Sequence, residues 1–313
     1  MISTYLTVVT GKSITTAKHM SDITVINDSQ QSDLVTNGLA KNGELYLKAA
    51  GSTNAGAIVV YDSGSWRTFA NEAASFINTY SVDFDGTNDY LDTGSNFGST
   101  LQSDWAISTW FKRNETTSST GTLFAHDYRV NGKHIIRVYF TSTSLLFDLH
   151  VASARAFTSF LYTPDTNWHH LVFSVSQSGG SVVTKTYLDG VYKTTASVTA
   201  SLSNYVNPIN LGVGAGLESI GAYDYSNAKQ DEFAIFGSAL SDGGVSTGQT
   251  AGGDIATLYN SGVPDDISSL NPVTHYRMGD NDSGAGTTIT DQGSGGNDGT
   301  LVNGPTFSTD VPS

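Results

Sequence analysis

Short runs that alternate apolar with polar residues and end in turn dipeptides recur along most of this chain. The two clearest runs are residues 166–173, TNWHHLVF, and residues 186–192, TYLDGVY. The second contains Asp189-Gly190, a strong hairpin signal, and Gly179-Gly180 marks another turn between the two runs. The pattern predicts an antiparallel meander with one buried face. We expect that face to carry Trp168, Leu171, Phe173 and Tyr187.

The rest of the composition fits a protein built from strands. The chain has 313 residues, enough for one large β-domain and a smaller one, and it is rich in Gly, Ser, Thr, Asn and Asp. Residues that favour long helices, such as Glu and Lys, are sparse. The spacing of short strands and turns is typical of a sandwich, so the predicted fold class is all-β.

Charge and residue content exclude several classes of function. The formal net charge of −14 is unsuited to binding nucleic-acid phosphates, and the chain contains no Cys for redox or thiolate–metal chemistry. No apolar run approaches the roughly 20 residues of a membrane span. Residues 1–18 lack the basic and then apolar pattern of an export signal, so we expect no signal peptide.

The first 79 residues form a distinct region. Alternating runs predict strands near residues 5–9, 23–26, 42–48, 57–61 and 66–69. The stretch GELYLK…AGAIVVYDSGSWRTF resembles short β-modules of phage virion proteins, particularly those near the ends of tail fibres. We therefore predict two domains: residues 1–79, a β-module for anchoring or oligomerisation, and residues 80–313, a sandwich.

Several motifs of the second domain occur in a family order. They are YSVDFDGTNDYLDTG, WAISTWFK, NWHHLVFSV, YLDGV, DEFAIF and a tail with YRMGD…GNDGTL. Together they resemble the laminin-G-like, concanavalin A-like lectin/glucanase family, which implies a jelly-roll sandwich. In many relatives the YRMGD-type segment opens the domain, whereas here it lies at the C-terminal end. The termini of compact domains often lie close together, so we expect the same strand to be supplied from the other end of the chain.

Catalysis finds little support in the residue pattern. Retaining glycosidases need two carboxylates about 5–5.5 Å apart, as alternate strand positions provide. Here Asp231 and Glu232 are adjacent, so we expect them to face opposite sides of a strand. His169 and His170 are adjacent as well, which argues against a two-histidine metal face. We therefore predict that the protein is not an enzyme.

Calcium is the candidate cofactor. Asp85, Asn88 and Asp89 place oxygen-bearing side chains in one tight turn, as calcium sites require. Asp231 is added because we expect its strand to start near that turn, and members of the resembled family often bind calcium near a sheet rim. The alternative is that Asp85-Gly86 and Asn88 simply form turns.

A glycan site is predicted on a loop rich in tyrosine. Aromatic rings stack on sugars, and Asn and Asp side chains bond to hydroxyl groups. The candidates in this loop are Tyr223, Asp224, Tyr225 and Asn227. These tyrosines would otherwise pack at a domain or subunit contact.

The leading functional prediction is a non-enzymatic phage virion structural protein, either a capsid decoration or a tail fibre. Its lectin-like domain would face outward from the virion surface and bind host-surface or environmental glycans. Residues 1–79 would bind other virion proteins in a homo-oligomer, for example a trimer, with no nucleic-acid or membrane partner. The alternatives are decoration without a ligand, a free or cell-surface bacterial lectin or adhesion module, and a polysaccharide-cleaving enzyme.

Overall fold

The structure is a computed structural model in which the chain divides into two compact units, Met1–Phe76 and Ile77–Ser313. Up to residue 69 it describes the strands and Ser29, and beyond that residues 76–117, 120–126, 136–205, 209–218 and 221–313. The boundary predicted from the sequence is at residue 80.

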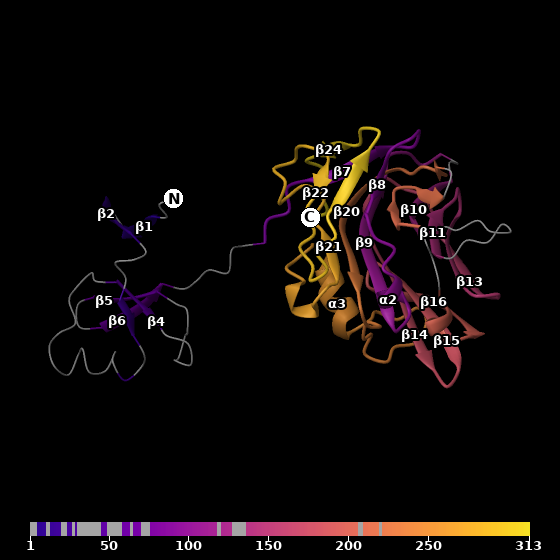
Figure 1. Ribbon diagram of the computed structural model, residues 1–313, viewed down its shortest axis with the longest axis horizontal. Helices are drawn as coiled ribbons and strands as arrows, with labels where there is room; N and C mark the ends of the chain where they lie inside the picture. The colour runs from indigo at the N-terminus through magenta and orange to yellow at the C-terminus, as the bar shows by residue number, and fades with distance from the viewer. Residues whose placement is uncertain are drawn as a thin grey trace. The chain divides into compact units, whose positions relative to one another are not determined.

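Six strands of the first unit form a hairpin and a four-stranded sheet (Figure 1). β1 (Tyr5–Thr10) pairs with β2 (Ser13–His19) in antiparallel fashion. β3 (Thr24–Ile26) runs parallel to β4 (Leu45–Lys48). β5 (Ile58–Asp62) then pairs with β4 and with β6 (Ser65–Phe69). The predicted strands are all present in this unit.

The second unit contains two eight-stranded sheets with antiparallel pairing, which confirms the predicted sandwich. Sheet I has the order β13-β12-β11-β10-β17-β8-β23-β22. In chain order its strands are β8 (Tyr90–Asp92), β10 (Gly121–His126), β11 (Ile136–Phe140), β12 (Ser144–Val151), β13 (Ala154–Leu161), β17 (Gly212–Val213), β22 (Thr288–Ile289) and β23 (Gly299–Val302).

Sheet II has the order β16-β15-β14-β9-β20-β7-β24, and β21 pairs with β20 beside this path. Its strands are β7 (Ser81–Asp85), β9 (Trp105–Arg113), β14 (Trp168–Ser178), β15 (Ser181–Leu188), β16 (Val191–Thr199), β20 (Asn227–Phe236), β21 (Thr274–Tyr276) and β24 (Thr306–Ser308). A small hairpin of β18 (Gly216–Glu218) and β19 (Gly221–Tyr223) stands apart. The helices α2 (Gly98–Leu101) and α3 (Gly253–Tyr259) are short, and no described helix has the length and hydropathy needed to cross a membrane.

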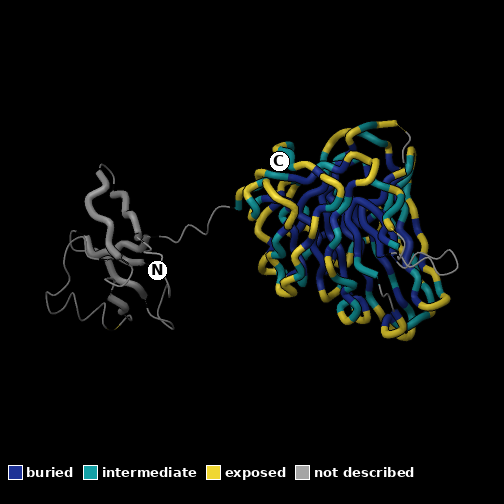
Figure 2. The backbone as a smooth tube through the Cα atoms, turned by 45° about the horizontal axis from the view of Figure 1, so that its top comes forward, coloured by how far each residue is buried: buried dark blue, intermediate teal, exposed yellow. Residues whose placement is uncertain are grey.

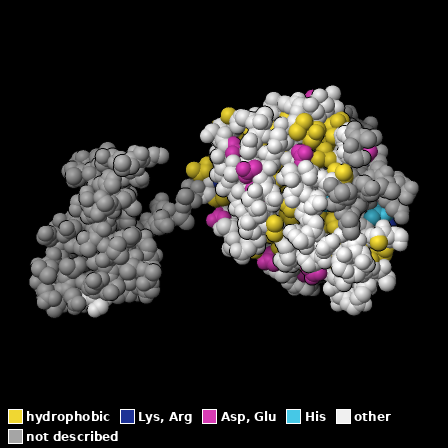
Figure 3. All heavy atoms as spheres, in the orientation of Figure 1, with side chains coloured by type: hydrophobic (Ala, Val, Ile, Leu, Met, Phe, Trp, Pro, Cys, Tyr) yellow, Lys and Arg dark blue, Asp and Glu magenta, His cyan; other side chains and the backbone are white. Residues whose placement is uncertain are grey.

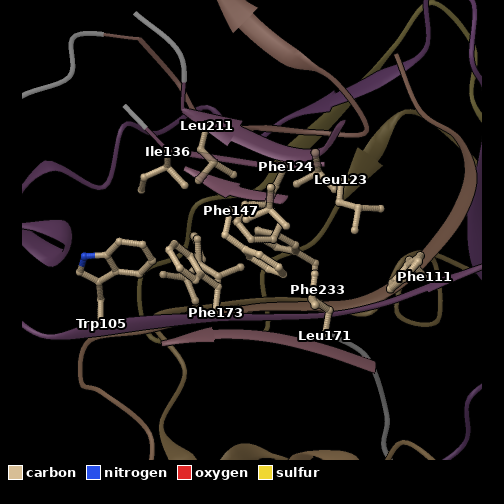
Figure 4. Close-up of a cluster of buried hydrophobic side chains, with 14 of the residues drawn as sticks. Trp105, Phe111, Leu123, Phe124, Ile136, Phe147, Leu171, Phe173, Leu211 and Phe233 are labelled. Atoms are coloured by element: carbon tan, nitrogen blue, oxygen red, sulfur yellow. The ribbon is translucent and has the colours of Figure 1, made fainter. Parts of the chain in front are cut away.

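The main core lies between the two sheets. Trp105 of β9 meets Phe173 of β14 edge to face, with ring centroids 5.6 Å apart, and Phe147 of β12 contacts Phe173 from sheet I (Figure 4). These side chains are buried, and the strands that carry them form the dark interior of the sandwich in Figure 2. The alternation of the strands therefore directs one set of side chains into the space between the sheets.

A second apolar cluster covers the opposite face of sheet II. Val172 and Tyr187 belong to it, together with Ile255 and Leu258 of α3. Leu171 and Phe173, which alternate with Val172, belong to the main core. The prediction that Trp168 and Tyr187 share a buried face with Leu171 and Phe173 is therefore wrong. Trp168 lies on the same face of β14 as Val172 and is only partly buried. Because the segment after β20 covers the second face, strands of sheet II are apolar on both sides.

His169 ties the start of β14 to two turns. Its Nδ1 lies 2.7 Å from Asp189 Oδ2, and its Nε2 lies 3.0 Å from Asp165 Oδ1. Asp189 Oδ1 also accepts a hydrogen bond from the His170 amide. Burial lowers the pKa of His169, but the bonds and charges of Asp189 and Asp165 outweigh it and raise that pKa above 6.5. His169, the His170 amide, Asp165 and Asp189 thus form one hydrogen-bonded network at the start of β14.

The C-terminal tail adds strands beside the first strands of the sandwich. β23 pairs with β8 in sheet I. In sheet II, β24 pairs with β7, and β21 pairs with β20 (Figure 1). The two ends of this unit therefore lie on neighbouring strands. This agrees with the expected permuted arrangement of the YRMGD…GNDGTL tail.

Candidate functional site

A pocket of about 420 Å³, which we call the rim pocket, opens where β7 and β9 end and β20 begins. Polar side chains provide most of its lining. Its residues are Asp83, Asp85, Asp89, Asn114, Asn227, Asn303, Gly304 and Thr306. It therefore joins two of the predicted calcium residues, Asp85 and Asp89, to one predicted glycan residue, Asn227.

Strand register explains how such distant residues meet. On β7 and β20, Asp85 stands opposite Asn227 and Asp83 stands opposite Lys229. Asn114 directly follows β9, and its amide donates to the Asn227 carbonyl at 3.2 Å. Thr306 of β24 pairs with Asp83 from the other side of β7. Four neighbouring strands, in the order β9-β20-β7-β24, thus end or begin at the pocket.

The Asn114 side chain is held in place from several directions. Its Nδ2 donates to Asp83 Oδ1 at 2.7 Å and to Asn227 Oδ1 at 3.0 Å. Lys229 Nζ donates to Asn114 Oδ1 at 2.9 Å and lies 3.1 Å from Asp83 Oδ2. One amide therefore sits at the centre of a network in which the Lys229 charge offsets that of Asp83.

The turn after β7 forms one wall of the rim pocket. Asp85 Oδ1 accepts hydrogen bonds from the amides of Thr87 at 2.7 Å and Asn88 at 3.4 Å. Gly86 adopts a φ of 76°, and a Cβ there would lie 2.8 Å from Asn227 Cβ. The turn consequently requires glycine both for its left-handed backbone and for its close approach to β20.

Negative charge accumulates at this wall. Asp89 is only 4% exposed, and its Oδ2 accepts from the Asp85 amide at 3.4 Å. Burial, and next the charge of Asp85, raise the pKa of the Asp89 carboxyl, with a smaller contribution from Asp83. Acidic side chains also appear at several places on the face of the sandwich in Figure 3. A bound cation would offset this negative charge.

The predicted calcium residues do not all meet. Asp85 and Asp89 line the rim pocket, and the Asn88 carbonyl accepts a hydrogen bond from Asn303 Nδ2 at 2.9 Å. Within the described part of the chain, no three His, Cys, Asp or Glu side chains gather closely enough to hold a metal ion. A calcium ion between Asp85 and Asp89 would therefore need carbonyl, amide, water or ligand oxygens to complete its usual six to eight.

Asp231 lies away from this group because β20 starts earlier than predicted. The strand begins at Asn227, which leaves Asp231 inside it, fully buried and bonded to Asn78 Nδ2 at 3.0 Å. Burial, and then the charge of Glu232, raise the pKa of Asp231 well above its usual range. Glu232 has a φ of 47° where the pairing of β20 with β9 shifts, and His275 contacts it. The predicted alternation of Asp231 and Glu232 is thus interrupted by a bulge.

The predicted glycan loop is divided between two places. Asn227 lines the rim pocket, whereas Asp224 Oδ2 lies 2.6 Å from Arg137 Nη2 on sheet I. The Arg137 guanidinium also lies 5.6 Å from the Tyr223 ring centroid. The Tyr225 hydroxyl donates to the Ala222 carbonyl at 2.9 Å and so closes the loop on itself.

Sequence reasoning missed three residues of these surfaces: Asn114, Asn303 and Arg137. Each stands far from its partners along the chain, and only the sheet register brings it there. The one signal available in the sequence was the place of a polar residue within or at the end of an alternating run. Asn114 ends an alternating run and Arg137 occupies a polar position within another.

Two packed antiparallel sheets of this order, with a polar pocket at their rim, define a jelly-roll sandwich of the lectin type. The laminin G-like profile of the concanavalin A-like lectin/glucanases superfamily matches residues 85–246, just over half of the chain. The chain therefore belongs to that superfamily. No curated protein matches the chain significantly.

Several solved structures are similar to the chain at low identity. One is a Bacteroides ovatus protein provisionally named a carbohydrate-binding protein, at 15% identity and a TM-score of 0.49, covering 87% of this chain and 71% of its own. Another is the CBM40 of the Ruminococcus gnavus IT-sialidase, at 10% and 0.40, covering 51% and 92%. A third is the SAP-like pentraxin of Limulus polyphemus, at 14% and 0.37, covering 54% and 80%.

Proposed function

We propose that the sandwich is a non-catalytic glycan-binding domain and that the rim pocket binds the sugar. The observation that carries the proposal is the pocket itself, about 420 Å³ in volume and lined by three carboxylates and three amides. Such groups accept and donate hydrogen bonds in the directions that sugar hydroxyls need. Membership of the superfamily supports the proposal without deciding it, since one fold serves many functions.

The network around Asn114 gives the proposed site a fixed geometry. Because Asp83, Asn227 and Lys229 all bond to its side chain, the amide does not have to be ordered when a sugar binds. Groups held in advance lose less entropy on binding. We therefore expect Asn114 to contribute to selectivity between sugars as well as to affinity.

Calcium belongs to the proposal as a ligand of the same pocket. Asp85 and Asp89 would hold the ion, and a bound sugar would add hydroxyl oxygens to its coordination. The geometry supports this assignment, because Asp85 and Asp89 lie in one turn and Asp83 lines the same pocket. Removal of divalent ions tests it directly.

We further propose that the protein belongs to a phage virion surface, as a capsid decoration or a tail fibre. Residues 1–79 would attach it to other virion proteins as a homo-oligomer, and the sandwich would face outward. The support is the resemblance of the GELYLK…AGAIVVYDSGSWRTF stretch to virion β-modules. Light scattering on the purified full chain tests the oligomer: a monomer at all concentrations would contradict this part.

Glycan-array binding tests the proposed function. The full chain is applied in calcium and again in EDTA, beside Asn114→Ala, Asp85→Ala and a control, Asn204→Ala. Asn204 is exposed, two residues after Leu202, whose amide donates to Gln177 Oε1. The Gln177 amide donates to Asp104, which precedes β9, whereas Asn114 follows the other end of that strand. We expect binding that both pocket variants lose and the control keeps. No binding to any glycan in either buffer would refute the function.

A further inference from the structure

The outer face of sheet I carries a row of aromatic and charged side chains across β11, β12 and β13. We call this row the outer strip and define it as Arg137, Asp148, Arg155, Phe157 and Leu161. Arg137 and Asp148 are buried, so the exposed part of the strip is Arg155, Phe157 and Leu161 on β13. In the register of the sheet, Arg137 stands opposite Asp148, and Asp148 opposite Phe157. Arg155 and Leu161 follow at alternate positions on β13, so they project to the same side.

The charges of the outer strip are paired within the protein. Arg155 and Asp148 form a bidentate ion pair, with Nε 2.8 Å from Oδ1 and Nη2 2.6 Å from Oδ2. Arg137 Nη2 lies 2.6 Å from Asp224 Oδ2. Because each guanidinium already has a carboxylate partner, the strip carries no excess positive charge that would attract an anion.

Apolar surface is concentrated on the same strand. Of the four large apolar side chains exposed among the described residues, Phe157 at 41% and Leu161 at 87% both lie on β13. The Arg155 guanidinium lies 4.5 Å from the centroid of the Phe157 ring, which orients that ring. A second core covers the outer face of sheet II, but Phe157 and Leu161 are exposed on sheet I.

We propose that the outer strip is a second carbohydrate subsite that binds an uncharged, extended polysaccharide chain. The inference rests on the proposed glycan-binding function and names the class of glycan. A pyranose ring has an apolar face that stacks on an aromatic ring such as Phe157, while its hydroxyls bond to Arg155, whose side chain is 49% exposed. A charged polysaccharide gains nothing from ion pairs that are already satisfied, and it meets a chain of net charge −14.

The test measures retention of the full chain by affinity electrophoresis in gels that contain a polysaccharide. Laminarin, mannan and hydroxyethyl cellulose are the neutral probes, and alginate is the acidic one. Phe157→Ala is compared with Val263→Ala. Val263 is another exposed apolar residue, and it lies shortly after the end of α3. Asn114→Ala reports on the rim pocket in the same gels.

We expect at least one neutral polysaccharide to bind, with about five- to ten-fold weaker affinity for Phe157→Ala and no change for Val263→Ala. The affinity should hardly depend on salt. Preference for alginate, unchanged binding by Phe157→Ala, or loss of self-association in that variant by light scattering would each overturn the subsite. If Asn114→Ala abolishes binding while Phe157→Ala leaves it intact, the proposed function stands and only the subsite fails. If no polysaccharide or array glycan binds the wild type, both fail.

Discussion

Two glycine turns in sheet II provide a matched test of the packing. Asp189-Gly190 joins β15 to β16 with φ values of 52° and 70°, and Gly179-Gly180 joins β14 to β15 with φ values of 57° and 82°. Both are two-residue turns with two positive φ angles, the form that suits a hairpin. Gly190 and Gly180 hold the same position in their turns, yet their surroundings differ.

The difference lies in what an added methyl group would meet. A Cβ at Gly190 would lie 2.6 Å from Tyr259 Cδ1, whereas at Gly180 nothing lies within 4 Å. The Tyr259 ring has little room to retreat, because it stacks on Trp110 with centroids 6.1 Å apart and on His170 at the same distance. A methyl group at Gly190 must therefore displace part of a packed aromatic cluster.

The expected magnitudes follow from these contacts. Alanine in a left-handed conformation costs about 1–2 kcal/mol, and this is the whole cost expected for Gly180→Ala. Gly190→Ala adds an overpacking cost of about 1–3 kcal/mol. For a domain of this size each kcal/mol lowers Tm by about 2–4 °C. Gly190→Ala should consequently lower Tm by several degrees more than Gly180→Ala.

Differential scanning calorimetry of the full chain measures both variants against the wild type. The comparison concerns the transition that belongs to the sandwich, and urea midpoints at 25 °C provide a second estimate. Equal shifts for the two variants would show that Tyr259 does not pack on Gly190 as described. A larger shift for Gly180→Ala would refute the reasoning altogether.

Three further predictions concern pH and the rim pocket. Because burial raises the folded pKa of Asp231 well above its ordinary value of 3.8, unfolding releases a proton, so stability should fall as pH rises above about 4. Asp231→Asn should make this fall shallower in urea midpoints measured from pH 5 to 8, where His169 contributes in the same direction. The pKa of His169 is raised above 6.5, so its stabilising contribution is complete below that pH and is lost as pH rises through the folded value. His169→Gln should therefore lower the urea midpoint at pH 5.5 more than at pH 8.5, and an equal loss would contradict the assignment. Gly86→Ala, with its φ of 76° and its contact with Asn227, should weaken glycan binding in the array more than Gly180→Ala, which leaves the rim unchanged.

The fold was largely readable in the sequence because its signals are local. Asp189-Gly190 marks a turn by backbone preference alone, and the alternation of residues 81–85, SVDFD, marks a strand. The side to which Tyr187 points was not readable. It depends on the segment after β20, which folds back over sheet II and gives that sheet two buried faces.

The candidate site was only partly predictable, for a physical reason. Asp85 and Asp89 lie in one turn, so their proximity follows from the chain itself. Asn114 and Asn303 reach the same pocket through strand register, which no local pattern encodes. Asp231 was placed at the rim because its strand was expected to start there, but pairing with β7 extends β20 back to Asn227.

The most direct test of the central claim is a nuclear magnetic resonance titration of the ¹⁵N-labelled full chain with the strongest glycan from the array. The side-chain amide signals of Asn114, Asn227 and Asn303 report on the rim pocket, and that of Asn204 serves as the internal control. If the pocket binds the sugar, the three pocket signals shift together and saturate at the same glycan concentration while Asn204 stays fixed. If the glycan binds and the three pocket signals do not move, the rim pocket is not the sugar site.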